Sequence, residues 1–257
     1  MEKLISSDGT PIAYTVAGEG PAVVFVTGAF NDHRTCLDLA AQLAGDHRTV
    51  LYDRRARGES GDTRPYAIAR EVEDLAAVLA VAGDEATVFG FSSGGVLALH
   101  AATELPGIAR LALYEAPFVP GRAGSDLPER LERLVDEGRP GDAVVLFQTE
   151  GIGLPAEVVE GIRRSPMFAA LEAIARSTVH DATITTAFST PTPAMSAVPI
   201  PTLFLNGEST WPVLAESART LAATLPTARH STVPGGADHG IPAVETARIL
   251  REFIAGG

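Results

Sequence analysis

The residues best suited to covalent chemistry lie at positions 90–94, which read Gly-Phe-Ser-Ser-Gly. This segment fits the pattern G-x-S-x-G, which places a serine on a sharp turn between a strand and a helix. Such a turn lifts the Ser92 hydroxyl clear of the sheet, and only glycine fits cheaply two residues away on each side. The free N–H groups of the following helix can hold an anion beside it. The pattern therefore predicts a nucleophile at Ser92, whereas the alternative is a Gly/Ser-rich loop that matches by chance.

The flanking residues favour the turn. Residues 86–89 form an apolar run typical of a strand, and residues 96–102 are good helix formers followed by Pro106 and Gly107. The pattern occurs once in the chain. These neighbours predict a strand, a turn at Ser92 and then a helix.

Length and composition indicate what kind of molecule must position this serine. The chain has 257 residues, 46% hydrophobic content and a formal net charge of -12. It can bury a substantial core, and its length suits one α/β domain with an insertion. The negative charge disfavours nucleic acid and anionic membranes as partners.

Cysteine and terminal residues indicate the compartment. Cys36 is the single cysteine, so it has no partner for an internal disulfide, and no Cys/His cluster has metal-ligand spacing. No cofactor or metal is expected. The N-terminal residues lack a basic region followed by an apolar core, and no apolar run is long enough to span a membrane. We expect a cytoplasmic protein.

Apolar runs alternate with helix-like segments along most of the chain. Residues 4–16 predict an opening hairpin, and β-type runs then recur at 22–26, 49–53, 86–89, 110–115, 201–207 and 229–233. Between residues 118 and 199 the β-signals disappear and helical stretches follow one another. We expect a core of residues 1–117 and 200–257, with residues 118–199 forming a helical cap over the carboxyl ends of the strands.

Two loops at that edge carry further candidates. The strand at 22–26 ends in Thr-Gly-Ala-Phe, and because ligands meet parallel sheets at such loops, the Ala29 N–H is a candidate donor to an anion. After the next strand, residues 53–60 contain three arginines, which we expect to pair with carboxylates and order the loop. The final loop, residues 234–240, presents His239 among glycines.

Taken together, these parts resemble the α/β-hydrolase superfamily along nearly the whole chain. The matching motifs are Thr-Gly-Ala at 27–29, the loop at 53–60, the turn at 90–94 and His239 in the last strand-to-helix loop. The resemblance implies a mostly parallel, eight-stranded sheet flanked by helices. It also implies Ser92 as nucleophile, His239 as base, and an oxyanion hole made by the N–H groups of Ser93 and Ala29.

The acid of the expected triad is harder to assign, because this superfamily usually has aspartate at the position that Thr210 occupies. Some members, including haloalkane dehalogenases and zearalenone-opening lactonases, take the acid from the strand after the turn helix, which corresponds to Glu115. Glu208 and Asp238 are the alternatives. We expect Glu115, since a carboxylate beside the nucleophile strand can orient the imidazole.

The resulting prediction is a serine hydrolase that cleaves a carboxylic ester or lactone through an acyl-enzyme. Acyl transfer, cleavage of a carbon–carbon bond and a non-catalytic binding protein on the same fold are the alternatives. We expect a small, mainly apolar substrate, because the cap supplies many large apolar side chains. The expected pocket residues are Phe30, Phe91, Phe118 and Trp211, and further possible walls are Phe147, Met167, Phe168, Phe188 and Met195.

Overall fold

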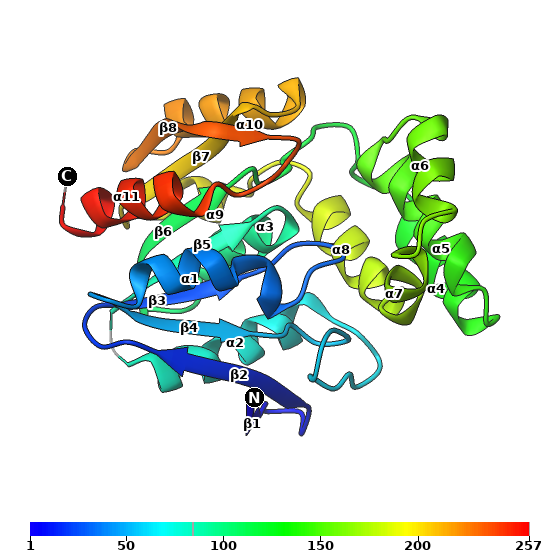
Figure 1. Cartoon of the computed structure of the whole chain (residues 1–257), viewed down its shortest axis with the longest axis horizontal. Helices are drawn as coiled ribbons and strands as arrows, with labels where there is room; N and C mark the ends of the chain where they lie inside the picture. Colours follow the sequence, from blue (N-terminus) through cyan, green and yellow to red (C-terminus); the bar gives the residue numbers. More distant parts are fainter. Residues whose placement is uncertain (84, 257) are drawn as a thin grey trace.

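A computed structural model describes residues 1–83 and 85–256 of the chain. Within these residues eight strands form one sheet in the order β1-β2-β4-β3-β5-β6-β7-β8 (Figure 1). The strands are β1 (Glu2–Ile5), β2 (Pro11–Ala17), β3 (Ala22–Val26), β4 (Arg48–Tyr52), β5 (Ala86–Phe91), β6 (Ile108–Tyr114), β7 (Thr202–Ser209) and β8 (Ala228–Ala237).

The strand directions match the sequence pattern. β1 pairs antiparallel with β2, and β2 with β4, whereas β3 to β8 pair in parallel. β3 and β5 are buried along their whole lengths, as the apolar runs predict for strands covered on both faces. The opening hairpin and the mostly parallel sheet are therefore confirmed.

Helices cover both faces of the sheet and bury separate cores. On one face α1 (Leu37–Leu43) and α11 (Ala243–Ile254) pack on the sheet, in front in Figure 1. On the other face lie α2 (Ile68–Ala82), α3 (Ser93–Ala101) and α10 (Pro212–Thr224). α3 is buried at nearly every position, which explains why it has no amphipathic pattern. Both faces of the sheet are therefore covered, and the catalytic candidates lie at the carboxyl ends of the strands.

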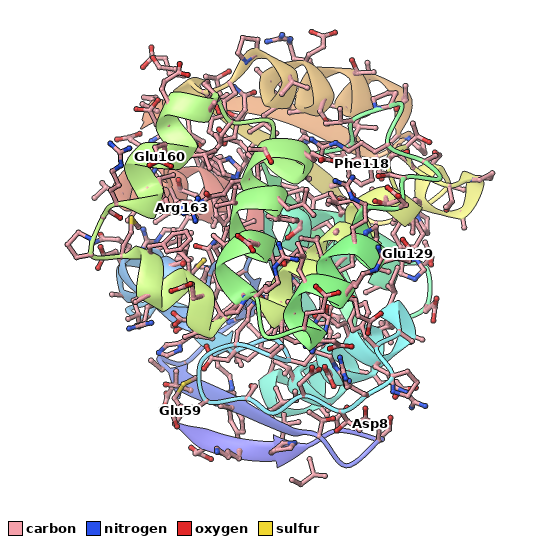
Figure 2. All side chains as sticks on the ribbon, turned by 90° about the vertical axis from the view of Figure 1, so that its right-hand side faces the viewer. Asp8, Glu59, Phe118, Glu129, Glu160 and Arg163 are labelled. Carbon is pink, nitrogen blue, oxygen red and sulfur yellow. The ribbon has the colours of Figure 1, made fainter. Side chains whose placement is uncertain are left out.

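The chain between β6 and β7 forms a helical insertion, which is called the cap below. Most of this stretch stands at one end of the sheet in Figure 1, and Figure 2 looks onto it directly. A separate core joins α4, α5, η2 and α8. The helices are α4 (Leu127–Asp136), α5 (Pro140–Leu146), the π-helical η2 (Phe147–Ile152), α6 (Ala156–Arg163), α7 (Phe168–Ala173), α8 (Arg176–Ala187) and α9 (Pro193–Ser196).

Two helices of this stretch, the long α8 and the short α9, lie beyond the individual helices that the sequence indicates. The sequence indicates individual helices near residues 127–137, 142–149, 156–164 and 168–176, whereas α8 begins at Arg176 and continues to Ala187. α8 contains four threonines, which are weak helix formers, and it is buried on most sides. A helix without an exposed polar face gives no amphipathic signal, so tertiary packing decided its structure.

Candidate active site

Ser92 occupies the turn between β5 and α3. Its φ of 55° and ψ of -129° differ from both strand and helix, which marks a strained residue. A methyl group built on Gly90 would lie 2.6 Å from Gly95 Cα, and one on Gly94 would overlap the carbonyl oxygen of Val26. The glycines of the pattern are therefore required by close backbone approach.

Parallel pairing brings a carboxylate beside this turn. The Ser92 N–H donates to the Tyr114 carbonyl at 2.9 Å, and Glu115 follows directly at the end of β6. The Glu115 N–H donates to the Leu205 carbonyl at 2.8 Å, which anchors this residue to β7. Two neighbouring strands thus end side by side with Ser92 on one and Glu115 on the other.

His239 lies in the loop after β8 and bonds to that carboxylate. Its Nδ1 is hydrogen bonded to Glu115 Oε2, while Glu115 Oε1 accepts the Gly207 N–H at 2.8 Å. Glu115 is fully buried, so both of its oxygens are held away from solvent. This arrangement orients the imidazole and leaves its Nε2 for another partner.

Aromatic rings pack against the imidazole. The Phe91 ring centre lies 4.7 Å from that of His239, and Trp211 stacks on it at 5.4 Å with an interplanar angle of 20°. Aromatic faces stabilise a nearby cation, and here they also restrict the imidazole's motion. The ring is therefore held by a carboxylate at Nδ1 and by flat apolar surfaces.

Backbone strain is concentrated at this edge of the sheet. Ser92, Glu115, Asp238 and His239 all have φ between 50° and 63°, although none is glycine. Phe30 has φ of 58°. Each such residue costs on the order of 1–3 kcal/mol, and natural proteins retain such strain mostly at functional sites.

The two predicted oxyanion donors come from different loops. The Ser93 N–H is at the start of α3, and the Ala29 N–H lies after β3. The described part of the chain gives neither N–H a hydrogen-bond acceptor. A methyl group on Gly28 would lie only 2.6 Å from Ser92 Cβ, so the β3 loop passes directly against the nucleophile turn.

Side chains hold the peptide groups on either side of the Ala29 N–H. Arg54 Nη1 donates to the Thr27 carbonyl at 3.0 Å. Asn31 Nδ2 donates to the Ala29 carbonyl at 2.5 Å. The Thr35 hydroxyl donates to Asn31 Oδ1 and so fixes the orientation of this side-chain amide. With both neighbouring carbonyls bonded, the intervening N–H has a fixed orientation.

A buried ion network supports this loop and connects it to the cap. Arg54 binds both oxygens of Glu71 at 2.7 Å, and its Nη1 also donates to Asp181 Oδ1 on α8 at 3.0 Å. Asp181 Oδ1 accepts the Ser93 hydroxyl at 2.7 Å, and Oδ2 accepts Arg57 at 2.5 Å. Two arginines and two carboxylates balance in charge, as a buried cluster requires.

The pKa values in this network follow from its geometry. Burial alone would raise the pKa of Asp181, but the charges of Arg57 and Arg54 and the Ser93 hydrogen bond hold it below its ordinary value. Burial opposes ionisation of Glu71 as well, yet the Arg54 charge and hydrogen bonds lower its pKa to about 2. Both carboxylates are therefore charged at neutral pH.

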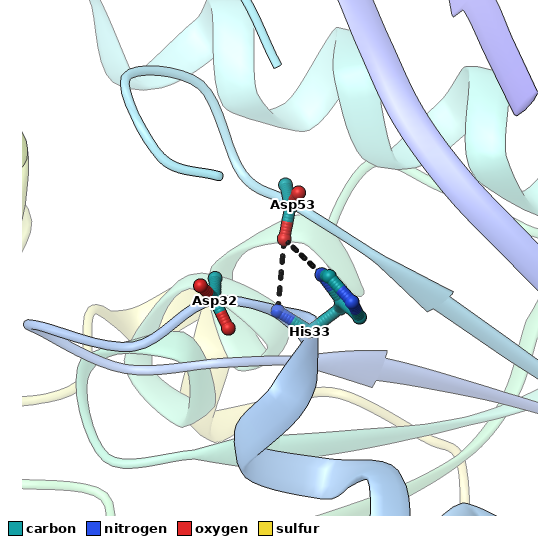
Figure 3. A group of neighbouring side chains, drawn as sticks. All are labelled: Asp32, His33 and Asp53. Atoms are coloured by element: carbon teal, nitrogen blue, oxygen red, sulfur yellow. Dashed lines mark hydrogen bonds and ion pairs between the residues drawn. The ribbon is translucent and has the colours of Figure 1, made fainter. Parts of the chain in front are cut away.

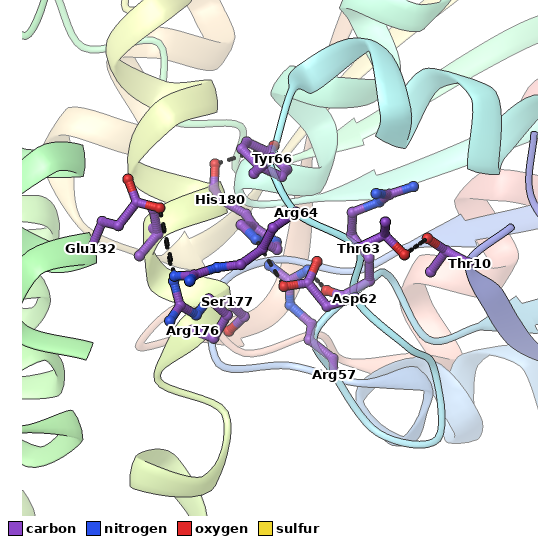
Figure 4. Close-up of polar contacts among 12 residues, drawn as sticks. Thr10, Arg57, Asp62, Thr63, Arg64, Tyr66, Glu132, Arg176, Ser177 and His180 are labelled. Carbon is purple, nitrogen blue, oxygen red and sulfur yellow. Dashed lines mark hydrogen bonds and ion pairs between the residues drawn. The ribbon is translucent and has the colours of Figure 1, made fainter. Parts of the chain in front are cut away.

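A second set of contacts fastens the cap to the loop after β4 (Figure 4). The Tyr66 ring stacks on His180 of α8 with centres 3.9 Å apart, and His180 Nε2 lies 3.7 Å from Asp62. Arg64 pairs with Asp136 at the end of α4. Together with the arginine pairs, these contacts confirm that the arginine-rich loop is ordered by ion pairs.

A cavity of about 100 Å³ lies where the cap meets these residues. Ser92, His239, Ala29 and Ser93 all line it. The other lining residues are mostly apolar: Asn31, Pro117, Val119, Arg122, Phe147, Gly151, Ile152, Thr185, Trp211, Val213 and Leu214. The nucleophile candidate, the imidazole and the two residues that carry the predicted oxyanion donors therefore line one pocket.

The structure separates the three candidate acids. Glu115 contacts His239, whereas Glu208 is exposed and accepts the Gly235 N–H at 3.2 Å. Asp238 is exposed next to the histidine. Thr210, at the usual acid position, has a buried hydroxyl with no hydrogen-bond partner in the described chain. Only Glu115 among these groups is bonded to the imidazole.

Of the four expected pocket residues, Trp211 lines the cavity and the other three do not. Phe118 is buried in the hydrophobic core on the face of the sheet that α2, α3 and α10 cover. Phe91 lies behind the imidazole against Tyr114, because side chains alternate along β5. Phe30 packs edge-on against Phe147, and Phe147 lines the cavity in its place.

One group of side chains near the site has metal-ligand character. Asp32, His33 and Asp53 have ligand atoms within 4.8 Å of one another (Figure 3). Asp53 Oδ1 already accepts the His33 N–H and ring Nδ1, and its Oδ2 accepts the Glu59 N–H. The carboxylate is thus engaged in ordering two loops.

Two residues at the site were missed by the sequence analysis. Asp181 lies on the unpredicted helix α8, and no local pattern indicates that it would meet Arg54 across more than a hundred residues. Arg122 lies in the irregular segment before α4 and lines the cavity. The one sequence feature that could have indicated Arg122 is its position shortly after Glu115, where the expected cap begins.

Comparison with known proteins identifies the family of this fold. Residues 23–252 match the family described as "Alpha/beta hydrolase family". The crystal structure of an alpha/beta hydrolase from Sphaerobacter thermophilus DSM 20745 is 41% identical, with a TM-score of 0.89 over 98% of this chain and 100% of that one. The resemblance found in the sequence and its implied fold are confirmed.

More distant matches share the fold alone. A thermophilic esterase from Thermogutta terrifontis is 22% identical, with a TM-score of 0.75 over 99% of this chain and 98% of that one. The enol-lactonase from Burkholderia xenovorans LB400 is 20% identical, with a TM-score of 0.71 over the same shares.

Among curated proteins, a pimeloyl-(acyl-carrier protein) methyl ester esterase of Xanthomonas campestris pv. campestris (strain B100) is 37% identical over 123 residues. The match covers 47% of this chain and 46% of that protein, so the chain spans about half the length of this relative. Among the described residues, no helix is both long and apolar enough to cross a membrane.

Proposed function

Because the chain belongs to the alpha/beta hydrolase family, we propose that it is a serine hydrolase that cleaves a small carboxylic ester or lactone through an acyl-enzyme. The observation that carries this proposal is the buried Glu115 carboxylate bonded to His239 Nδ1, with His239 and Ser92 lining one cavity. A serine, an imidazole and a carboxylate in these positions provide a nucleophile, a base and the group that orients the base.

The first half of the reaction forms an ester bond to the enzyme. His239 Nε2 takes the Ser92 proton as Oγ attacks the carbonyl carbon, and the carbonyl electron pair moves onto its oxygen. The N–H groups of Ala29 and Ser93 stabilise this oxyanion. As the tetrahedral intermediate collapses, the imidazolium returns the proton to the leaving alkoxide, and an alcohol departs.

Water completes the cycle by the reverse sequence. His239 takes a proton from water, the hydroxide attacks the acyl carbon, and the proton returns to Ser92 Oγ as the acid leaves. During both halves the buried Glu115 charge stabilises the imidazolium. With a lactone the released hydroxyl and acid stay on one molecule, so the same steps open a ring.

The cavity limits the size and character of the substrate. Its volume of about 100 Å³ is of the order of the engineered cavity of about 150 Å³ that holds benzene. Apolar walls from Trp211, Phe147 and Leu214 favour a short hydrocarbon body. The relatives that are named esterases support ester cleavage for this chain.

Labelling with an active-serine phosphonate tests the proposal. The wild type should lose activity on short-chain esters as it gains one covalent adduct at Ser92, identified by peptide mass. Ser92→Ala should lose the label and all but a small residue of activity, a loss of several powers of ten. Ser93→Ala is the matched control, because it retains the backbone N–H and should still be labelled.

The same measurements distinguish the alternatives. No label on the folded wild type would indicate a binding protein on the hydrolase fold and would contradict the proposal. A label without hydrolysis of any ester or lactone in a panel of varied acyl length would contradict ester cleavage, and would indicate acyl transfer or carbon–carbon bond cleavage on the same residues.

A further inference from the structure

Arg122 is the one cavity-lining cation, apart from the imidazole, in the described part of the chain. It lies between Glu115 and α4, in the segment that leads into the cap, and its side chain is half-buried. Within the described residues its guanidinium has no hydrogen-bond or ion-pair partner, and only its backbone carbonyl is engaged, by the Ser125 N–H at 3.2 Å. Burial lowers the pKa of this guanidinium, in contrast to paired arginines such as Arg54.

Asn31 and Thr185, two of the other polar side chains that line the cavity, are already engaged. Asn31 donates to Ala29 and accepts from Thr35, and the Thr185 hydroxyl donates to the Asp181 carbonyl at 2.9 Å. Apart from the proposed catalytic residues, Arg122 is therefore the one charged lining side chain without a partner among the described residues. A half-buried guanidinium without a partner loses solvation and gains nothing in return, so an anion that enters the cavity would compensate it.

We propose that Arg122 binds a carboxylate on the substrate, so that the preferred substrates are esters or lactones that carry a free carboxylate on an otherwise short apolar body. This inference rests on the proposed function and specifies its substrate class. A planar guanidinium matches a carboxylate through two parallel hydrogen bonds, and the partly dry cavity strengthens them.

The charge of the whole molecule makes this role specific to Arg122. With a formal net charge of -12 the protein repels anions at long range. Other unpaired cap arginines, such as Arg133 and Arg163, are exposed to water and lie outside the cavity. A preference for carboxylate-bearing substrates would therefore have to come from a local group, and Arg122 is that group.

The test compares two esters of similar shape. Monomethyl glutarate carries a carboxylate, and methyl 5-methylhexanoate replaces it with an isopropyl group. The wild type should have the higher kcat/KM for monomethyl glutarate. Arg122→Met, which keeps the apolar stem, should lower kcat/KM for monomethyl glutarate about 10- to 100-fold and change that for the neutral ester less than about threefold.

Arg133→Met is the matched control and should leave both values unchanged. Equal losses on both esters in Arg122→Met, or a wild-type preference for the neutral ester, would overturn the role of Arg122 while leaving ester cleavage intact. If neither ester is cleaved, calorimetry with the glutarate dianion on Ser92→Ala still tests the site. If glutarate binds to Ser92→Ala but not to the double variant with Arg122→Met, the result supports the proposed site. If glutarate does not bind to Ser92→Ala, the result contradicts the proposed site.

Discussion

Asp181 on α8 accepts the hydroxyl of Ser93 at 2.7 Å, so a cap helix is bonded to the residue that follows the proposed nucleophile. The same carboxylate binds Arg54, whose guanidinium also holds the Thr27 carbonyl of the other oxyanion loop. One buried cluster thus connects the cap with both segments that carry the proposed oxyanion donors. We therefore expect a displacement of α8 to change the geometry of the site.

Replacing Asp181 tests this coupling. Asp181→Asn leaves Arg54 and Arg57 with Glu71 as their one buried carboxylate, and uncompensated buried charge typically costs about 3–5 kcal/mol. We expect the free energy of unfolding to fall by that amount and kcat to fall at least about tenfold, because the Ser93 and Thr27 segments loosen. Urea denaturation and steady-state kinetics measure both.

Asp136→Asn provides the control for this experiment. Asp136 of α4 pairs with Arg64 in the loop after β4 and with Arg176 of α8, and the Asp136 side chain is exposed. Exposed pairs contribute about 0–1 kcal/mol, so this variant should remain close to wild type. Similar small effects in both variants would show that the buried cluster does not position the site.

Gly28 tests how closely the oxyanion loop must approach the nucleophile. In Gly28→Ala the new methyl group would lie 2.6 Å from Ser92 Cβ, so one of the two segments must move. We expect kcat to fall about 100-fold, since displacement of one oxyanion donor costs about 10²- to 10³-fold. Gly45→Ala, where no atom lies within 4 Å of the new methyl group, should retain full activity. Unchanged kcat in Gly28→Ala would refute the assignment of this loop.

Glu115 is expected to be the acid of the triad. In Glu115→Gln the amide oxygen can still accept the Gly207 N–H, but the NH₂ group would face His239 Nδ1 and favour the wrong tautomer. Turnover should fall about 10³- to 10⁴-fold with the fold retained, as shown by circular dichroism. Glu208→Gln and Asp238→Asn should lose little, and a severe loss at Glu208 with a mild one at Glu115 would reverse the assignment.

The sequence predicted the parts of the site whose positions follow from strand order. Ser92, Glu115 and His239 each follow a strand of one parallel sheet, and the carboxyl ends of parallel strands meet at one edge. Their roles stay predictions. The apolar runs and glycines indicated the strands and loops, and the family resemblance selected Glu115 and His239 among the candidates. Strand order also indicated Ala29, whereas Ser93 was implied by the family resemblance, and both residues line the cavity.

The missed features depend on packing between segments distant in sequence. α8 has no amphipathic pattern because it is buried on nearly all sides, so Asp181 could not be placed. Phe118 and Phe91 were expected in the pocket because they are large and near the site, yet their side chains point into the hydrophobic core. Arg122 lies in an irregular segment whose path the periodicity of the sequence does not determine.

The pH dependence of stability provides a last test, which concerns Glu71. This buried carboxylate has a pKa of about 2 in the folded chain against an ordinary value of 4.5, because Arg54 overcomes the effect of burial. A lowered folded-state pKa contributes stability that is fully present above pH 4.5 and is lost as the pH falls towards 2. In that window the unfolded chain binds a proton that the folded chain does not.

Glu71→Gln removes this proton linkage. We expect the variant to be several kcal/mol less stable than wild type at pH 7, since Arg54 loses its bidentate partner. The difference should narrow between pH 4.5 and about 2, where wild type loses up to about 1.4 kcal/mol per pH unit from this group. Urea denaturation of both proteins at pH 7, 4.5 and 3 measures it. A difference that stays constant from pH 7 to 3 would show that Glu71 is not held ionised by Arg54.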